Sequence, residues 1–254
     1  MEQIPHIVHY CWFGKSKKTP EAERYIQGWK RILPDYQFVE WNEENFQMTQ
    51  YPYAEGAYSE KRYAFVSDVA RVWALYTQGG IYLDTDVEIR RDFSECLEGK
   101  SVVLGFEADD HLMTAFMAAA PGHPLMKEML HHYADRTFDA AGNLDGEANP
   151  AILTDLAEKR GLVRKNRRQE LSEDIVVFPM DYFSAYRLRG EQVCSTENTY
   201  TVHHFSASWK PLGVRFRKVC KRVIQSMMGQ EILDFAVERN RRRVEKNAET
   251  QAGY

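Results

Sequence analysis

Apolar and polar positions alternate along this chain in blocks that predict strands and helices in turn. Residues 4–13 (IPHIVHYCWF) are rich in β-branched and aromatic side chains and predict a buried first strand. Thr19 followed by Pro20 is a helix-start signal, and the helix that it opens runs to Leu33. Residues 36–41 predict a second strand. Strands that alternate with helices are typical of a parallel sheet covered by helices.

The stretch 65–89 (FVSDVARVWALYTQGGIYLDTDVEI) is the organising segment of the chain. An amphipathic helix comes first, and the Gly-Gly pair at 79–80 ends it. Residues 81–83 then form a short apolar strand that leads directly into Asp84 and Asp86. The sequence therefore predicts that this strand delivers two carboxylates to its C-terminal end, where open α/β sheets bind ligands.

The helix of this segment has two kinds of surface. Asp68 and Arg71, three positions apart, share a polar face. The neighbouring apolar face consists of Phe65, Val69, Val72 and Tyr76.

Asp84 and Asp86 form a D-x-D pair. Residues two apart in a strand point the same way, about 7 Å from each other. Such carboxylates repel unless a cation lies beside them, and a hard divalent ion with phosphate oxygens as further ligands fits that need. An acidic turn after a strand is the simpler interpretation of a bare D-x-D.

The rest of the chain continues the alternation. Strands are predicted at 102–107, 112–119, 175–179 and 200–204, and helices at 124–134 and 151–160. We expect an α/β fold with a mostly parallel sheet flanked by helices. The expected domains are 1–211, which forms the α/β body, and 212–254, a helical tail.

Composition narrows the class of protein. With 254 residues, 44% hydrophobic and 28% charged, the chain suits one soluble α/β domain. Its four cysteines are scattered without a C-x-x-C pair, which favours a reducing compartment over a zinc site or a disulfide framework. The start, MEQIPHIVHY, has no basic region before an apolar run, and no segment approaches 18 apolar residues. We therefore expect a cytoplasmic protein.

Charge is spread unevenly over the chain. Residues 212–254 contain ten Arg or Lys against five Asp or Glu, a net charge of +5. The whole chain carries −4, so residues 1–211 carry −9. This polarity predicts a basic appendage on an acidic body and argues against a nucleic-acid-binding protein.

Residues 214–228 predict a tail helix with two faces. Its apolar side is formed by Phe216, Val219, Cys220, Val223, Ile224 and Met227, and its basic side by Arg215, Lys218, Lys221 and Arg222. One interpretation is an anchor on an anionic membrane surface, which would make the protein peripheral at the inner face of the cell membrane. The other is an ordinary helix packed on the sheet with a solvated back.

The string SDVARVWALYTQGGIYLDTDV resembles the sugar-nucleotide-binding core of retaining glycosyltransferases with the D-x-D motif. It is most similar to family 32, the capsular-polysaccharide and Och-type mannosyltransferase relatives, and more distantly to the glucosylating toxins. The resemblance implies a GT-A-like, Rossmann-like fold. It also implies that Asp68 and Arg71 hold the donor sugar and phosphate, that Tyr82 lies beside the nucleotide, and that Asp84 and Asp86 bind ribose and metal.

Two further matches add residues on the donor side. From the residues alone, Trp12 is a core aromatic, but HYCWFG matches the family's opening strand, whose Trp stacks on the nucleotide base. The family's G-P-x-x-x-T segment, which contacts the donor sugar, is matched only in part: the chain has Asn149-Pro150 and Thr154 without the glycine.

The end of the last predicted strand resembles the family's H-H-x-x-x-S-W. That match implies a metal contact from His204, which we prefer to His203, and contacts to the diphosphate from Ser208 and Trp209, with Lys210 as a phosphate-binding cation. Imidazole with carboxylates favours manganese, or else magnesium.

The function implied is that of a metal-dependent retaining glycosyltransferase, with Asp68, Arg71, Asp84 and Asp86 in catalytic roles. It would transfer a hexose from a UDP- or GDP-sugar to a glycan or lipid-linked oligosaccharide in surface polysaccharide synthesis. One alternative is a haloacid-dehalogenase-like phosphatase. The segment LDTDVEI resembles the D-x-D-x-[TV] loop of those enzymes, although Glu88 stands where that motif needs Thr or Val. The other is a non-catalytic protein that binds membrane surfaces through the tail.

Overall fold

The computed structural model describes residues 3–138, 149–187 and 192–206. The chain divides into two compact units, of which the first comprises Met1–Tyr186 and Val193–Ser206. The second comprises Arg187–Gln192 and Ala207–Tyr254. The predicted tail helix at 214–228 lies outside the described residues. In the part of the chain that the structure describes, no helix has both the length and the apolar character needed to cross a bilayer.

The first unit is built on a seven-stranded sheet with the order β2-β1-β3-β6-β5-β8-β7. Five of its strands run in one direction, and β6 and β7 run in the other. The seven strands are β1 (Ile7–Cys11), β2 (Gln37–Trp41), β3 (Gly80–Leu83), β5 (Val102–Gly105), β6 (Phe116–Ala119), β7 (Gln169–Glu170) and β8 (Ile175–Phe178). The prediction of a mostly parallel sheet is confirmed, although β6 inserts an antiparallel strand at its centre.

A separate antiparallel pair joins β4 (Val87–Ile89) to β11 (Thr201–His203). In the described part of the chain, the remaining strands are two short ones, β9 (Tyr186–Arg187) and β10 (Gln192–Val193). The last long strand predicted from the sequence therefore does not join the main sheet. It pairs instead with the segment that follows the D-x-D residues.

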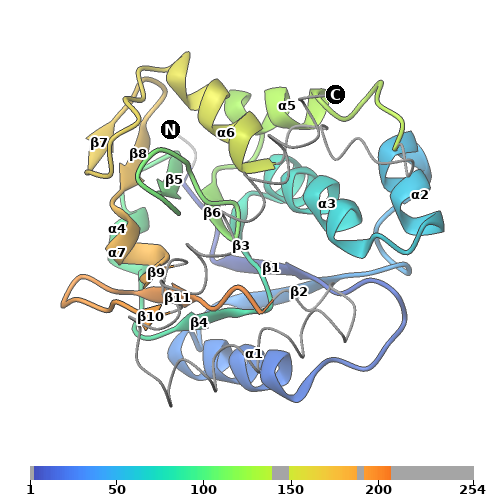
Figure 1. Ribbon diagram of the computed structural model, residues 1–254, viewed down its shortest axis with the longest axis horizontal. Coiled ribbons are helices and arrows are strands. Elements are labelled where there is room, and N and C mark those ends of the chain that lie inside the picture. Colours follow the sequence, from blue (N-terminus) through green and yellow to red (C-terminus); the bar gives the residue numbers. More distant parts are fainter. Residues whose placement is uncertain (1–2, 139–148, 188–191, 207–254) are drawn as a thin grey trace, which may run out of the picture. The chain divides into compact units, whose positions relative to one another are not determined.

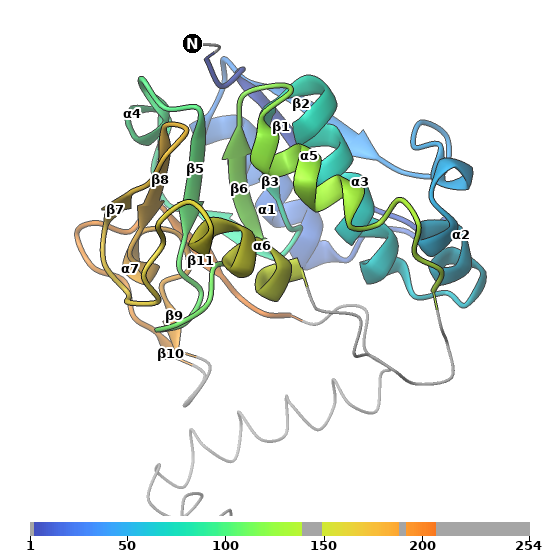
Figure 2. The same cartoon turned by 90° about the horizontal axis from the view of Figure 1, so that it is seen from above.

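Helices cover both faces of the sheet (Figure 1). The longer ones are α1 (Pro20–Ile32), α2 (Pro52–Ser59), α3 (Tyr63–Gln78), α5 (Pro124–His131) and α6 (Asn149–Glu158), and the shorter ones are α4 (Ser94–Leu97), α7 (Met180–Phe183) and the 3₁₀ turn Met48–Gln50. Figure 2 shows α3 and α5 on one side of the strands and α1 on the other. The expected layered α/β architecture is confirmed.

Each face of the sheet has its own apolar core, because neighbouring strand residues point to opposite sides. In β3, Tyr82 joins the core beneath α3, α5 and α6. Ile81 and Leu83 join the core beneath α1, where Trp29 is fully buried. The strand that leads into the D-x-D residues is thus held from both sides.

The turn from α3 into β3 depends on Gly79 and Gly80. Their φ angles are +65° and +98°, in the left-handed region that favours glycine. A Cβ at Gly80 would lie 2.5 Å from the backbone oxygen of Ile7, so a side chain there would force β1 and β3 apart. The buried ring of His9 adds a bond from Nε2 to the Gly79 oxygen at 2.8 Å. The Gly-Gly break that the sequence predicts is confirmed, and close strand packing is its physical reason.

Candidate active site

Asp84 and Asp86 lie in the turn between β3 and β4, and not within a continuous strand as expected. The backbone N–H of Asp84 donates to Ala115 O at 2.9 Å, and that of Val87 donates to Asp84 O at 3.0 Å. These bonds hold the turn against the central strands of the sheet. The turn, and not the two-residue period of a strand, brings the two carboxylates to the same side.

Arg71 links α3 to this turn. Its Nη2 lies 3.0 Å from Asp68 Oδ1 and 3.4 Å from Asp84 Oδ1. Its Nη1 donates to the backbone oxygen and the hydroxyl of Thr114, at 3.0 and 3.1 Å. The guanidinium lies over the ring of Tyr82, and the hydroxyl of Tyr82 donates to Asp84 Oδ1 at 2.8 Å. Four of the five residues that the resemblance takes from this segment therefore form one connected network: Asp68, Arg71, Tyr82 and Asp84.

Burial and charge compete within this network. Burial raises the pKa of Asp68 to about 6, although the neighbouring Arg71 acts in the opposite direction. Burial opposes the charge of Arg71, but Asp84, Tyr82 and Asp68 together hold its pKa above the ordinary value. Burial likewise keeps the pKa of Tyr82 well above its ordinary value, so its phenol stays neutral and donates to Asp84.

Asn149 extends the network from the first turn of α6. Its Nδ2 donates to the backbone oxygen and to Oδ1 of Asp68, at 3.0 and 3.1 Å. The hydroxyl of buried Tyr133 donates to Asn149 Oδ1 at 2.5 Å. Asn149 itself is buried, and its amide is held against the carboxylate of the first motif.

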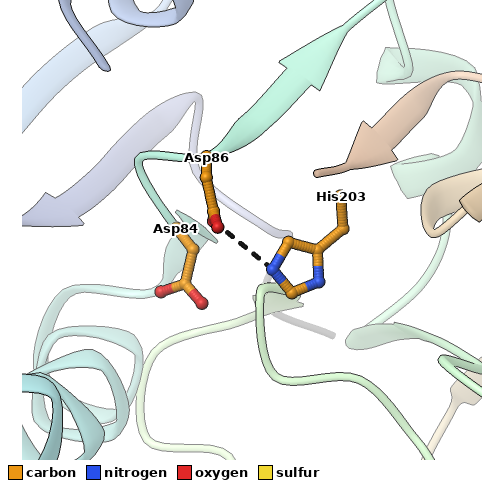
Figure 3. A group of neighbouring side chains, drawn as sticks. All are labelled: Asp84, Asp86 and His203. Carbon is orange, nitrogen blue, oxygen red and sulfur yellow. Dashed lines mark ion pairs between the residues drawn. The ribbon is translucent and has the colours of Figure 1, made fainter. Parts of the chain in front are cut away.

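Asp84, Asp86 and His203 each offer one ligand atom within 4.8 Å of the others (Figure 3). His203 Nε2 lies 3.3 Å from Asp86 Oδ1. Burial alone would lower the pKa of His203, but Asp86 and Glu107 raise it to about 10. Burial alone would raise the pKa of Asp86, and the nearby His203 lowers it. Two carboxylates and an imidazole that converge in this way fit a divalent cation such as manganese.

His204 lies on the other side of β11. Its Nε2 lies 2.8 Å from Glu88 Oε2, and its ring stacks on Tyr25 with centroids 5.1 Å apart. Adjacent strand residues point to opposite faces, and the pairing of His203 with Val87 turns His203 toward the D-x-D turn. The preference for His204 is therefore corrected: His203 is the histidine of this cluster.

Trp12 directly follows β1 and is half-buried, whereas its neighbours Cys11 and Phe13 are buried. Its indole N–H donates to Ser16 O at 2.8 Å. Trp12 is therefore less deeply buried than the two residues beside it. The other predicted donor-side residues, Ser208, Trp209 and Lys210, lie outside the described residues.

Three contacting residues have no role in the sequence patterns. Thr114 anchors Arg71, Tyr133 orients Asn149, and Glu107 Oε1 lies 3.3 Å from His203 Nδ1. Glu107 carried one signal, its place at the C-terminal end of a predicted strand. Thr114 and Tyr133 carried none.

The family model described as "Glycosyltransferase sugar-binding region containing DXD motif" matches residues 19–103. This range includes α1, α3, β3 and the Asp84–Asp86 turn.

Two curated relatives come from Schizosaccharomyces pombe. Inositol phosphoceramide mannosyltransferase 1 is 26% identical over 165 residues, which cover 61% of this chain and 51% of that protein. Inositol phosphoceramide mannosyltransferase 3 is 31% identical over 143 residues, which cover 54% of this chain and 39% of that protein. The chain thus spans about half the length of these relatives, or less.

Among solved structures, the PaToxG glycosyltransferase superposes with a TM-score of 0.53 at 18% identity, over 62% of this chain and 70% of that one. This likeness establishes the GT-A-like fold. Residues 19–103, which include the Asp84–Asp86 turn, are thus similar to the DXD-containing sugar-binding region of glycosyltransferases.

Proposed function

We propose that this chain is a divalent-metal-dependent retaining glycosyltransferase, which transfers a hexose from a UDP- or GDP-sugar to a glycan or lipid-linked acceptor. One observation carries the proposal: Arg71 contacts the carboxylates of both Asp68 and Asp84, beside the cluster of Asp84, Asp86 and His203. A site for a sugar diphosphate needs groups that accept hydrogen bonds from the sugar hydroxyls, and positive charge beside the phosphates. Both kinds of group meet here at the C-terminal ends of the strands.

In this proposal Asp68 accepts a hydrogen bond from a donor-sugar hydroxyl, and Asn149 holds the Asp68 carboxylate in place and contacts the sugar. The N–H groups of Arg71 are directed to Ser67, Thr114, Asp68 and Asp84. Arg71 therefore acts mainly by fixing the two acids and by placing positive charge near the diphosphate. The half-buried Trp12 supplies the ring on which the nucleotide base stacks.

Asp84, Asp86 and His203 are the residues that would hold manganese or magnesium. When bound, such an ion supplies Lewis-acid neutralisation of the departing nucleoside diphosphate. Arg71 lies beside Asp84, and the imidazole of His203 lies beside Asp86. These two contacts orient the carboxylates of Asp84 and Asp86. Retention would follow if the acceptor hydroxyl attacks the face of the sugar that the diphosphate leaves: the bond to the diphosphate breaks, the new glycosidic bond forms, and the hydroxyl proton passes to the leaving phosphate. The resemblance assigns Ser208, Trp209 and Lys210 to contacts with the diphosphate.

Mannose is the hexose that the relatives favour. Both S. pombe proteins are named inositol phosphoceramide mannosyltransferases, which supports a mannosyl donor and an acceptor attached to a lipid. A role in surface polysaccharide synthesis at the inner face of the cell membrane is the setting that we propose for this activity.

The test is a panel of UDP- and GDP-hexoses incubated with the protein and Mn²⁺, with release of nucleoside diphosphate as the measurement. We expect turnover with one donor, loss of turnover in excess chelator, and recovery when Mn²⁺ is returned. Asp86→Asn should abolish turnover, because a charged ligand of a hard cation is lost. The exposed Asp109→Asn is the matched control and should leave turnover unchanged.

Three results would contradict the proposal. Turnover that is unaffected by chelator would exclude the metal role. Release of phosphate from simple esters, without any nucleotide, would indicate a phosphatase. Binding to vesicles with no turnover of any donor would indicate a binding protein.

A further inference from the structure

Glu107 is a charged residue beside the candidate metal cluster, and the proposed function gives it no role. It follows β5, and its backbone N–H donates to His111 O at 2.9 Å. The adjacent bridge between Phe106 and Leu112 closes this loop. Because β5 and β3 run in the same direction, the loop lies at the same edge of the sheet as the Asp84–Asp86 turn. The side chain of Glu107 is only 20% exposed.

His203 lies between two carboxylates. Its Nε2 is 3.3 Å from Asp86 Oδ1, and its Nδ1 is 3.3 Å from Glu107 Oε1. The ring of Phe205 packs against the imidazole with centroids 3.8 Å apart. The two ring nitrogens of His203 therefore face different partners: Nε2 faces Asp86 of the candidate metal cluster, and Nδ1 faces Glu107 outside it.

The Nδ1 atom has a demand that Glu107 can meet. Nδ1 is buried, and among the described residues no well-aligned hydrogen bond reaches it. A histidine that gives the lone pair of Nε2 to a cation carries its proton on Nδ1. That proton needs an acceptor, and the carboxylate of Glu107 is the polar group that faces it at 3.3 Å. A small rotation of either side chain would turn this contact into an aligned bond.

We infer that Glu107 is the positioning residue of the metal cluster: it accepts the Nδ1 hydrogen of His203 and so fixes the ring with Nε2 directed at the cation. The inference rests on the proposed metal-dependent function. Carboxylates that orient a ligating histidine in this way commonly change metal affinity by about 10- to 100-fold when they are removed.

The experiment compares Mn²⁺ affinity by calorimetry in wild type, Glu107→Ala and Glu107→Gln. We expect Glu107→Ala to weaken binding by about 10- to 100-fold, and Glu107→Gln, which keeps an acceptor oxygen, to restore affinity to within about threefold of wild type. Asp110→Asn is the matched control, because Asp110 pairs with His111 Nδ1 at 2.6 Å on the same loop but at the exposed surface. It should leave Mn²⁺ affinity unchanged.

Unchanged affinity in Glu107→Ala would overturn the inference. Equal weakening in the Ala and Gln variants would also overturn it, because charge and not the acceptor would then be what matters. A second measurement separates this inference from the proposed function: solvent exchange of the His203 Nδ1 proton, followed by NMR without metal. We expect slow exchange in wild type and in Glu107→Gln, and fast exchange in Glu107→Ala. A wild type that shows this pattern but binds no Mn²⁺ contradicts the metal proposal alone, whereas fast exchange in wild type contradicts the role of Glu107.

Discussion

The side-chain amide of Asn149 donates hydrogen bonds to both the backbone oxygen and the carboxylate of Asp68, at 3.0 and 3.1 Å. Tyr133 secures the other end of the amide, because its hydroxyl donates to Asn149 Oδ1. The carboxylate of Asp68 is thus fixed before any donor binds. It is fixed at a place where burial raises its pKa to about 6.

Asp68→Asn is therefore expected to stabilise the fold while it removes activity. The pKa of Asp68 in the folded protein, about 6, lies above the ordinary value of 3.8. Between these values the folded state holds a proton that the unfolded state has released, so stability falls as the pH rises through this window. Above the window, ionised Asp68 costs about 1–3 kcal/mol of unfolding free energy, and an amide avoids that cost.

Urea unfolding measures this difference. The midpoint of Asp68→Asn should exceed that of wild type at neutral pH and should meet it below the ordinary carboxyl pKa. The exposed Asp109→Asn should not differ from wild type at either pH. A lower unfolding free energy for Asp68→Asn at neutral pH would refute the expectation.

His203→Ala and His204→Ala form a matched pair for the metal cluster. Loss of His203 removes one of three ligands, so Mn²⁺ affinity measured by calorimetry should fall by more than about tenfold. Loss of His204 removes a contact with Glu88 and a ring stacked on Tyr25, both away from the cluster. It should lower thermal stability modestly and leave Mn²⁺ affinity unchanged. The reverse pattern of affinities would restore His204 as the ligand.

Trp12→Ala should weaken the binding of a nucleoside diphosphate by about 1–3 kcal/mol, the scale of stacking between a base and an aromatic ring. Trp12→Phe keeps a ring and should retain most of the affinity. Calorimetric titration of UDP and GDP in the presence of Mn²⁺ is the measurement. Because Trp12 is half-buried, both variants should fold. An unfolded Trp12→Ala would instead identify Trp12 as a core residue.

His9 is expected to limit stability in acid. Its buried ring binds Gly79 O through Nε2 and accepts the indole N–H of Trp41 at Nδ1, so it must be neutral. Burial lowers its pKa from 6.5 to about 4, although the bond to Gly79 opposes the shift. Between these values the unfolded state binds more protons, and stability is lost as the pH falls through the window, by up to about 3 kcal/mol.

The pH dependence of urea unfolding tests this expectation. His9→Gln should be less stable at neutral pH, but its unfolding free energy should change less between pH 6.5 and about 4. His131→Gln, at an exposed position at the end of α5, should keep the wild-type slope. An unchanged slope in His9→Gln would show that other groups cause the acid sensitivity.

The basic tail remains a prediction from sequence. If residues 214–228 bind anionic lipid, the protein should sediment with vesicles that contain anionic lipid and not with neutral ones, and salt should release it. Reversing the charge of Lys218, Lys221 and Arg222 should abolish vesicle binding without slowing donor hydrolysis in solution. Wild type that ignores anionic vesicles at low salt would favour the interpretation of an ordinary packed helix.

Local patterns predicted most of the fold. Thr19 accepts a hydrogen bond from the N–H of Ala22, as a helix cap should, and α1 begins at Pro20. The spacing of Asp68 and Arg71 correctly predicted a pair on α3. Such features were readable because each depends on residues within one or two turns.

Features set by distant partners were not readable in the same way. The sequence 112–119 predicts one strand, but only Phe116–Ala119 forms β6, because Thr114 and Ala115 turn their backbone oxygens to Arg71 and Asp84. The choice between His203 and His204 depends on the register of β11 against β4, which leaves no mark in either segment alone. Glu107 gained its neighbour His203 in the same way, through tertiary packing.

The short ladder between β4 and β11 has a consequence for how this site varies and how it could be transplanted. Three residue pairs fix it, with His203 opposite Val87. Insertions in the long connection between β4 and β11 leave these three residue pairs unchanged. A single residue gained or lost within either strand would instead present Val202 or His204 to Asp86, since a slip of one position reverses every side chain. The metal cluster therefore depends on both strands keeping their length and register. To graft it onto another protein, β4 and β11 would have to be moved together.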